Sequence, residues 1–375
     1  MPIVALPATI QSVTFGVKAR GYSLGDSSVS ERSGKLSYTL LRGRTALNLE
    51  GSTVDYQALG RSVTGLVPSS LRLDMMLRPG DTLTLLGRTG SRPASLDSIQ
   101  TAALSVVGSS LVDLESFSFG TQAMFGGRAT FAFPVGDLVL SLRGGFDYEP
   151  RPSAAITTYW RGTTVQGGAT VLGNIGMGTL SGAADVSYSS ADSLGGKNLY
   201  PGGGSLSVVG VLNMPIDNPR TDDGDPWDAV LMTYWVKPLA AARTDQPNLL
   251  LPVGTTMGLT GMMTAPVGAT ALRSSLDLIR TSSSATVVTG ASSATTTSTG
   301  WAASFGLDAT VPMSSHLDLM PEVGYTLGNA SLNFTQTSTT TPIFRRGRQL
   351  TKTTGNLVSD SMRGWWFGVA ISASF

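Results

Sequence analysis

The sequence predicts an all-β chain folded as a transmembrane antiparallel up-and-down β-barrel, on three observations. Charged residues make up 14% of the 375 residues, against about 25% in a typical soluble protein. The chain is nevertheless only 41% hydrophobic and holds 45 glycines. No segment approaches the roughly 18 to 20 consecutive apolar residues that a transmembrane helix needs. Finally, apolar and polar residues alternate with a period of two in many segments, as in strands with one apolar and one polar face.

Composition also excludes several kinds of chemistry. Cysteine is absent, which removes disulfides, thiolate metal sites and cysteine nucleophiles. The net charge of +1 gives no bulk attraction to nucleic acid. Residues 1–8 lack the basic segment and apolar core of a signal peptide, so we expect that an export signal is missing from this sequence. We treat residues 1–375 as a single barrel domain.

The early strands show the alternation clearly. Val13, Phe15 and Val17 point to one face, and Lys18 and Arg20 to the other. Tight turns are predicted at residues 42–44 and 78–81, since the Pro-Gly and Gly-Asp pairs of the second supply the backbone angles of a reversal. Long polar connections are predicted at residues 25–32 and 57–68.

The clearest hairpin spans residues 117–148 and turns at residues 134–136. Apolar residues occupy every second position on both arms, and polar residues fill the positions between them. Nine alternating positions in the first arm exceed the usual soluble strand of five or six residues and suit the roughly 9 to 11 that cross a bilayer at a tilt. The outward set of the first arm is Phe117, Phe119, Thr121, Ala123, Phe125, Gly127, Ala129, Phe131 and Phe133.

The remaining segments complete an even-numbered barrel. Further strands are predicted near residues 156–172, 178–191, 204–214, 227–237, 251–264 and 269–281, then in two segments around residues 301–311 and 317–327. Long Ser, Thr and Gly-rich connections are predicted near residues 192–203, 238–250, 282–298 and 337–360. The sum is about sixteen strands with seven short turns and eight long loops, as expected when both termini share one side. The phase is ambiguous at residues 156–172 and 227–236, so fourteen or eighteen strands remain open.

The last strand carries a resemblance to a known class. Trp365, Phe367, Val369 and Ile371 alternate with small or polar residues up to the terminal Phe375. This pattern resembles the closing strand of bacterial outer-membrane β-barrels and implies an outer-membrane location. It further implies pairing with the first strand, contact of the odd-numbered face with lipid, and recognition of the terminal Phe by the barrel-assembly machinery. In this phase Trp365 joins the outer aromatic girdle and Trp366 faces the lumen.

Residues 91–116 are predicted to form the third long external loop. The layout resembles the general porins, in which the third external loop folds inward and constricts the pore. By that resemblance the loop packs on the wall through Ile99, Leu104 and Val107. Its candidate constriction residues are Asp97, Asp113 and Glu115. The alternative is that the loop caps the outside.

The inward charges sort by region. Opposed basic and acidic walls predict a transverse field that orients polar solutes in a water-filled lumen. The alternative is local pairing, for example of Arg72 with Asp74 and of Arg273 with Asp277. The candidate pore-lining basic residues are Lys18, Arg20, Arg72, Arg88, Arg128 and Arg143. The candidate acidic residues are Asp185, Asp277, Asp308, Asp318 and Glu322.

Catalytic and metal sites are weakly supported. The single histidine, His316, lies beside a predicted turn, away from any Ser or Asp arrangement that would activate a nucleophile. We therefore expect no enzyme and no cofactor. An acidic stretch offers oxygen ligands for Ca²⁺ but lacks the spacing of an EF-hand loop. Its weak candidates are Asp217, Asp222, Asp223 and Asp225.

Two functions remain open. The resemblance favours an outer-membrane porin for passive diffusion of small hydrophilic solutes and ions, assembled as a trimer. The alternative is a structural or adhesive barrel whose Ser/Thr-rich loops make surface or lattice contacts. Outer-membrane lipid is the expected partner in both cases. A basic cluster in the last loop is a candidate for lipopolysaccharide binding, namely Arg345, Arg346, Arg348 and Lys352.

Overall fold

The computed structural model describes residues 9–24, 27–58, 61–90, 123–150, 159–160, 163–190, 192–194, 197–200, 203–216, 226–239, 254–289, 292–340 and 349–375. Every regular element in these residues is a β-strand. Those of the first half are β1 (Thr9–Leu24), β2 (Ser27–Arg42), β3 (Thr45–Ala58), β4 (Arg61–Arg78), β5 (Asp81–Arg88), β6 (Met124–Val135), β7 (Leu138–Tyr148), β8 (Tyr159–Trp160), β9 (Thr164–Ile175) and β10 (Gly178–Ser189). Those of the second half are β11 (Asp192–Leu194), β12 (Lys197–Tyr200), β13 (Gly203–Ile216), β14 (Trp227–Pro238), β15 (Thr255–Val267), β16 (Thr270–Thr289), β17 (Ser292–Ser314), β18 (Leu317–Thr340) and β19 (Gln349–Ser374).

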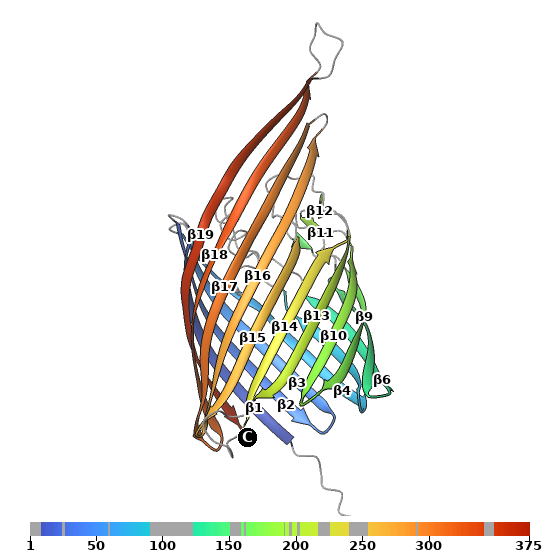
Figure 1. Ribbon diagram of the computed structural model, residues 1–375, viewed down its shortest axis with the longest axis vertical. Coiled ribbons are helices and arrows are strands. Elements are labelled where there is room, and N and C mark those ends of the chain that lie inside the picture. Colours follow the sequence, from blue (N-terminus) through green and yellow to red (C-terminus); the bar gives the residue numbers. More distant parts are fainter. Residues whose placement is uncertain are drawn as a thin grey trace, which may run out of the picture.

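Sixteen of these strands close into one antiparallel barrel, which confirms the predicted fold class (Figure 1). Each strand pairs with its neighbours along the chain, and β1 pairs with both β2 and β19. Val17 lies opposite Val369 in the closing pair, and the Phe375 N–H donates to the Gln11 carbonyl at 2.9 Å. The barrel therefore has no open edge at its first and last strands, as a lipid environment requires. Strands β8, β11 and β12 form a separate small sheet.

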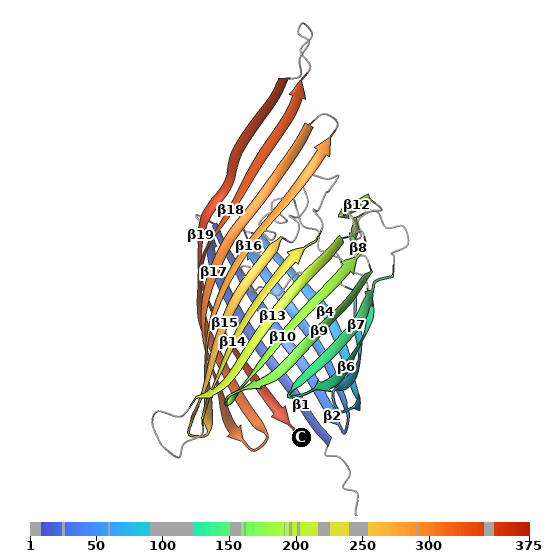
Figure 2. The same cartoon turned by 45° about the vertical axis from the view of Figure 1, so that its right-hand side comes forward.

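The two ends of the barrel differ in their connections. Both ends of the barrel-forming chain lie at the same end, where seven of the connections also lie (Figures 1 and 2). Positive-φ glycines occupy five of the turns there: Gly43, Gly80, Gly136, Gly176 and Gly268. Two features require glycine at position 80: its φ is 87°, and an added Cβ would come within 2.6 Å of the Ala132 Cβ.

Several predicted long loops are instead strands. The segments predicted as loops at 282–298 and 337–360 belong largely to β16 to β19, which pair in register from Thr281↔Gly300 to Thr289↔Ser292 and from Thr340↔Gln349 downward. Strands β2 and β4 likewise begin at Ser27 and Arg61, inside the loops predicted at 25–32 and 57–68. The prediction was wrong because alternation reports contact with lipid on one face only. A strand that rises into water on both sides need not alternate, and Thr, which is frequent in these segments, favours strands.

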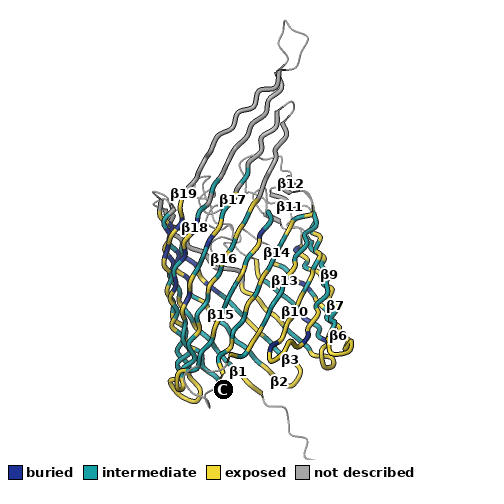
Figure 3. Tube along the Cα trace, viewed as in Figure 1, coloured by how far each residue is buried: buried dark blue, intermediate teal, exposed yellow. Residues whose placement is uncertain are grey.

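The outer face of the barrel forms an apolar belt. Large hydrophobic side chains are exposed on it at alternate positions, so that exposed and partly buried residues alternate along most strands (Figure 3). On β19 the belt runs from Trp365, which is 63% exposed and lies 4.7 Å from the Tyr325 ring centroid, to Phe375. Ten residue steps correspond to about 33 Å along the strand, or about 25 Å along the axis at a tilt of about 40°, the height of a membrane-barrel belt.

Candidate functional site: the luminal wall

The inner face of the barrel carries most of the described charges on the strands. Strand register extends the face of Lys18 and Arg20 from one strand to the next, and it brings all eleven described candidate residues onto this face. Their positions therefore agree with the alternation in the sequence. Their role in lining a conducting pore stays a prediction.

Each of the six candidate basic residues forms an ion pair. The pairs are Lys18–Glu322 at 3.0 Å, Arg20–Glu31 at 3.3 Å, Arg72–Asp74 at 2.7 Å, Arg88–Glu149 at 2.6 Å, Arg128–Asp147 at 3.5 Å, and Arg143–Asp185. The partner of Arg273 is Asp308 at 2.8 Å, rather than the Asp277 suggested by sequence spacing. Since Arg273 and Asp308 are direct cross-strand neighbours, register decides this pair. Much of the wall's field is thus cancelled locally.

Three of these pairs reach across an intervening strand: Arg88–Glu149 spans β6, and the other two pass a glycine. Lys18 on β1 and Glu322 on β18 both lie opposite Gly368 of β19. Arg143 on β7 and Asp185 on β10 both lie opposite Gly168 of β9. A Cβ built at either glycine would overlap a carboxylate oxygen of the pair. The glycines therefore leave the space through which the two charges meet, a signal that the sequence contained and that we did not use.

Trp366 lies flat along the luminal wall, as predicted for an inward side chain. A Cβ at Gly324 would overlap the indole, and one at Gly306 on the next strand would lie 3.1 Å from it. The Lys18 ammonium lies 4.3 Å from the centroid of the ring. The indole therefore adds a cation–π contact to the Lys18–Glu322 pair.

A buried cluster occupies the lumen side of β1 to β3. Arg20 is 7% exposed and Glu31 1%, although both face inward. Ser33 and Val54, neighbours on β2 and β3, are also buried. These side chains are therefore shielded from water, whereas Lys18, two residues nearer the amino terminus, and its partner Glu322 are 23% and 32% exposed.

The opposite side of the lumen is apolar. Val209 and Val211 of β13 face inward beside Tyr234 and Met232 of β14. On β15 the inward positions next to them are Gly258 and Thr260. Strand β14 is apolar on both faces, since Leu231 and Trp235 point outward. Residues 227–236 gave an ambiguous phase for this reason.

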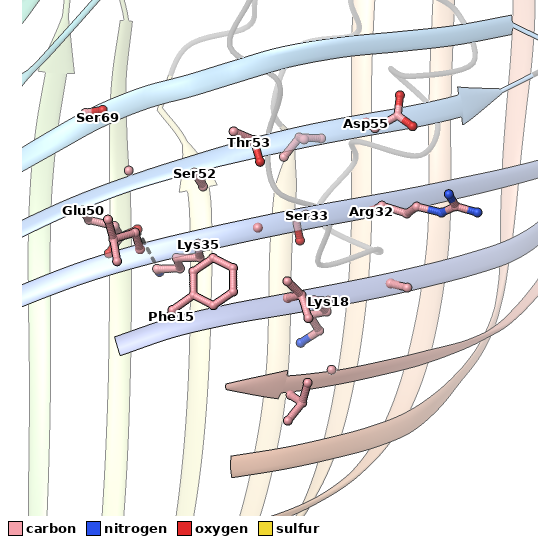
Figure 4. A pocket seen from close by; sticks show the side chains of 18 of the residues that line it. Phe15, Lys18, Arg32, Ser33, Lys35, Glu50, Ser52, Thr53, Asp55 and Ser69 are labelled. Carbon is pink, nitrogen blue, oxygen red and sulfur yellow. Dashed lines mark ion pairs between the residues drawn. The ribbon is translucent and has the colours of Figure 1, made fainter. Parts of the chain in front are cut away.

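One hollow lies in the wall itself. It has a volume of about 1230 Å³ and runs along β1, β2, β3 and β19 (Figure 4). Its lining includes outward side chains such as Phe15 and Leu36 as well as the luminal Lys35 and Glu50, which pair at 2.8 Å. Because the lining spans both faces of a single-layered wall, this hollow is not the channel.

The other candidate sites add little within the described residues. Residues 91–116 with Asp97, Asp113 and Glu115, the calcium candidates between 217 and 225, and Arg345, Arg346 and Arg348 lie outside them. In the part of the chain that is described, no three His, Cys, Asp or Glu side chains gather closely enough to hold a metal ion. Nor do these residues form a helix long and apolar enough to cross a membrane. His316 is exposed beside the β17–β18 turn, where its backbone N–H donates to the Ser314 hydroxyl.

Comparison with known proteins yields structural similarity at low identity. No protein-family model and no curated protein sequence matches the chain. Among solved structures, OmpT, an outer membrane protein of Vibrio cholerae, covers 100% of both chains at 12% identity and a TM-score of 0.37. OccK5 of Pseudomonas aeruginosa covers 98% of both at 8% identity and 0.44. OprD of the same organism covers 97% of this chain and 95% of its own at 8% identity and 0.43. At these scores, the fold assignment rests on the strand pairing of this chain alone.

Proposed function

We propose that the protein is an outer-membrane channel for passive diffusion of small hydrophilic solutes and ions. The observation that carries the proposal is the division of the closed wall into an apolar outer belt and a charged inner face. This division matches the composition of membrane barrels that enclose water. Catalysis has no comparable support, because His316 lies at a turn rather than among inward acidic residues.

We expect weak ion selectivity from the channel. Each candidate basic side chain has an acidic partner, so that a passing ion meets dipoles rather than a wall of one sign. The partly exposed pairs, such as Lys18–Glu322 and Arg143–Asp185, are the groups that a hydrated solute would contact.

The channel is proposed to narrow beside β1 to β3. The burial of Arg20 and Glu31 supports this, since inward side chains shielded from water indicate a filled lumen at their level. By the porin resemblance, residues 91–116 form the constriction loop, with Asp97, Asp113 and Glu115 in its polar lining. This part of the proposal concerns residues outside those described.

A homo-oligomer, by resemblance a trimer, is proposed to form through the face of β6 to β13. Small residues point outward on these neighbouring strands, which permits close approach of two chains in a membrane. They are Ala129, Gly144, Gly167, Ala169, Gly182, Ala184 and Gly210.

The exposed Phe375 at the barrel end is proposed as part of the signal for the assembly machinery.

Conductance across a planar bilayer tests the channel proposal. Purified protein should give stepwise openings of porin size, and a correctly folded protein that stays silent would refute diffusion.

The second candidate, a structural or adhesive barrel, is favoured by one observation. Strands β16 to β19, 20 to 26 residues long, continue past the ends of β1 and β14 (Figure 2). If the protein is an adhesive barrel, removing the outer parts of β16 to β19 should abolish surface adhesion. If it is a diffusion channel, the same truncation should leave conductance intact.

A further inference from the structure

On the later strands, at the end of the barrel opposite the chain termini, three described basic side chains take no part in the luminal ion pairs. They are Lys237 of β14, Arg280 of β16 and Arg363 of β19, and all three are exposed. Register puts each on the outer face: Lys237 lies opposite Leu206, Arg280 opposite Met257, and Arg363 opposite Leu327. We propose that these three residues bind the phosphate groups of lipid A, the lipid part of lipopolysaccharide in the outer leaflet. The inference rests on the proposed outer-membrane function and its orientation.

Each of the three basic residues stands beside an outward-facing tryptophan. The pairs are Lys237 with Trp235, Arg280 with Trp301, and Arg363 with Trp365. Trp301 is 47% exposed and is the direct cross-strand neighbour of Arg280. Because tryptophan is enriched where hydrocarbon meets the headgroups, these pairs mark that boundary.

The outer face changes character at the level of these pairs. Towards the chain termini the next outward positions are apolar, for example Leu278 on β16 and Phe367 on β19. In the other direction they are polar on β16 and β17, where Ser282 and Thr299 follow. This end carries the connection at residues 91–122, and the termini lie at the opposite end. A cation here is therefore at headgroup depth in the external leaflet.

The charge on this surface is of one sign. Every acidic side chain described on β13 to β19 faces the lumen: Asp228, Asp277, Asp308, Asp318 and Glu322. The ion pairs of the described residues include none of the three outward bases. Arg32 on β2 differs, because Asp55 is its cross-strand neighbour on the same face. Three uncompensated cations at headgroup depth match a ligand with several phosphates.

The barrel supplies a matched control at its other end. Arg42 of β2 is exposed on the outer face opposite Thr9, close to the chain termini. It has the same chemistry as Arg280 and Arg363 but lies at the level of the opposite leaflet. A Gln substitution there removes an equal charge from the lipid-facing surface.

Lipid binding by the whole protein in detergent tests the proposal. The probes are bisphosphorylated lipid A, the same lipid without phosphates, and phosphatidylglycerol, with bound lipid counted by native mass spectrometry. Combined Lys237→Gln, Arg280→Gln and Arg363→Gln should weaken binding of bisphosphorylated lipid A about 100-fold, and each single change about fivefold. Arg42→Gln should change it less than about twofold, and wild-type protein should bind the phosphate-free lipid weakly.

Several outcomes would overturn the proposal. They are full binding by the triple variant and by each single variant, equal loss in Arg42→Gln, or equal wild-type affinity for phosphate-free lipid A or phosphatidylglycerol. The single variants decide the matter if the triple variant does not fold. Because the measurement needs no conductance, a silent protein that binds lipid A through these residues would refute the channel and leave this surface standing.

Discussion

The two sides of the lumen are built differently. On β1 to β10 the inner face carries cross-strand ion pairs, such as Arg143–Asp185, held between glycines and small polar residues. On β13 and β14 it carries Val209, Met232 and Tyr234, with no charge at the same level on these strands. On the charged side, residue type alone distinguishes the inner face of each strand from its outer face. On the apolar side, only the pairing with neighbouring strands distinguishes the two faces.

The largest loss of stability is expected at the buried Arg20–Glu31 pair on the charged side. Glu31→Gln removes the Glu31 carboxylate from beside the buried Arg20 and should lower the free energy of unfolding by about 3 to 5 kcal/mol. Urea unfolding followed by gel mobility would measure this. Glu50→Gln is the control, because its partner Lys35 is 47% exposed and the pair contributes only about 0 to 1 kcal/mol. Equal losses in the two variants would contradict the buried cluster.

A smaller effect is expected where a glycine separates two charges. Gly168→Ala drives a methyl group into the Asp185 carboxylate and should cost about 1 to 3 kcal/mol, with separation of the Arg143–Asp185 pair. The same change at Gly261 on β15 meets open space and should be nearly neutral. Unfolding of the two variants side by side tests the role of the gap, and an equally stable Gly168→Ala protein would show that the pair does not need it.

The smallest effect concerns the turn at the base of the charged side. The Ala132 N–H, donating to Asp81 at 2.9 Å, and the paired Arg78 hold the pKa of the Asp81 carboxyl below its usual value. A lowered folded-state pKa stabilises the protein above the unfolded value of about 3.9, and this stabilisation is lost as pH falls through the folded pKa. Asp81→Asn should therefore be less stable than wild type at pH 7 and match it near pH 2. A difference in stability between Asp81→Asn and wild type that persists unchanged at acid pH would exclude this linkage.

Most of the barrel could be predicted from sequence because lipid imposes a simple rule on its outer face. Phe15, Val17 and Phe367 follow that rule, and their phase fixed the strands, the closing pair and the inward positions of Lys18 and Trp366. The rule fails for the outer parts of β16 to β19, whose sequence is rich in Ser and Thr and shows no alternation. It fails also on β14, which is apolar on both.

The partners of the inward charges could be predicted only in part. The Arg72–Asp74 pair follows from spacing along one strand. Pairs such as Arg20–Glu31 and Arg88–Glu149 depend on register and on side chains far apart in the sequence. Gly168 and Gly368 were a readable signal, since an inward glycine between inward opposite charges permits a pair across three strands.

Ion selectivity of single channels tests the central claim most directly. Reversal potentials under a salt gradient should show a weakly selective wild-type channel. Arg143→Glu places two carboxylates together on the charged side and should shift the channel towards cations. Arg280→Glu, the same change on the outer face, should leave selectivity unaltered. A conducting Arg143→Glu channel with wild-type selectivity would contradict the account that these paired charges line the path of ions.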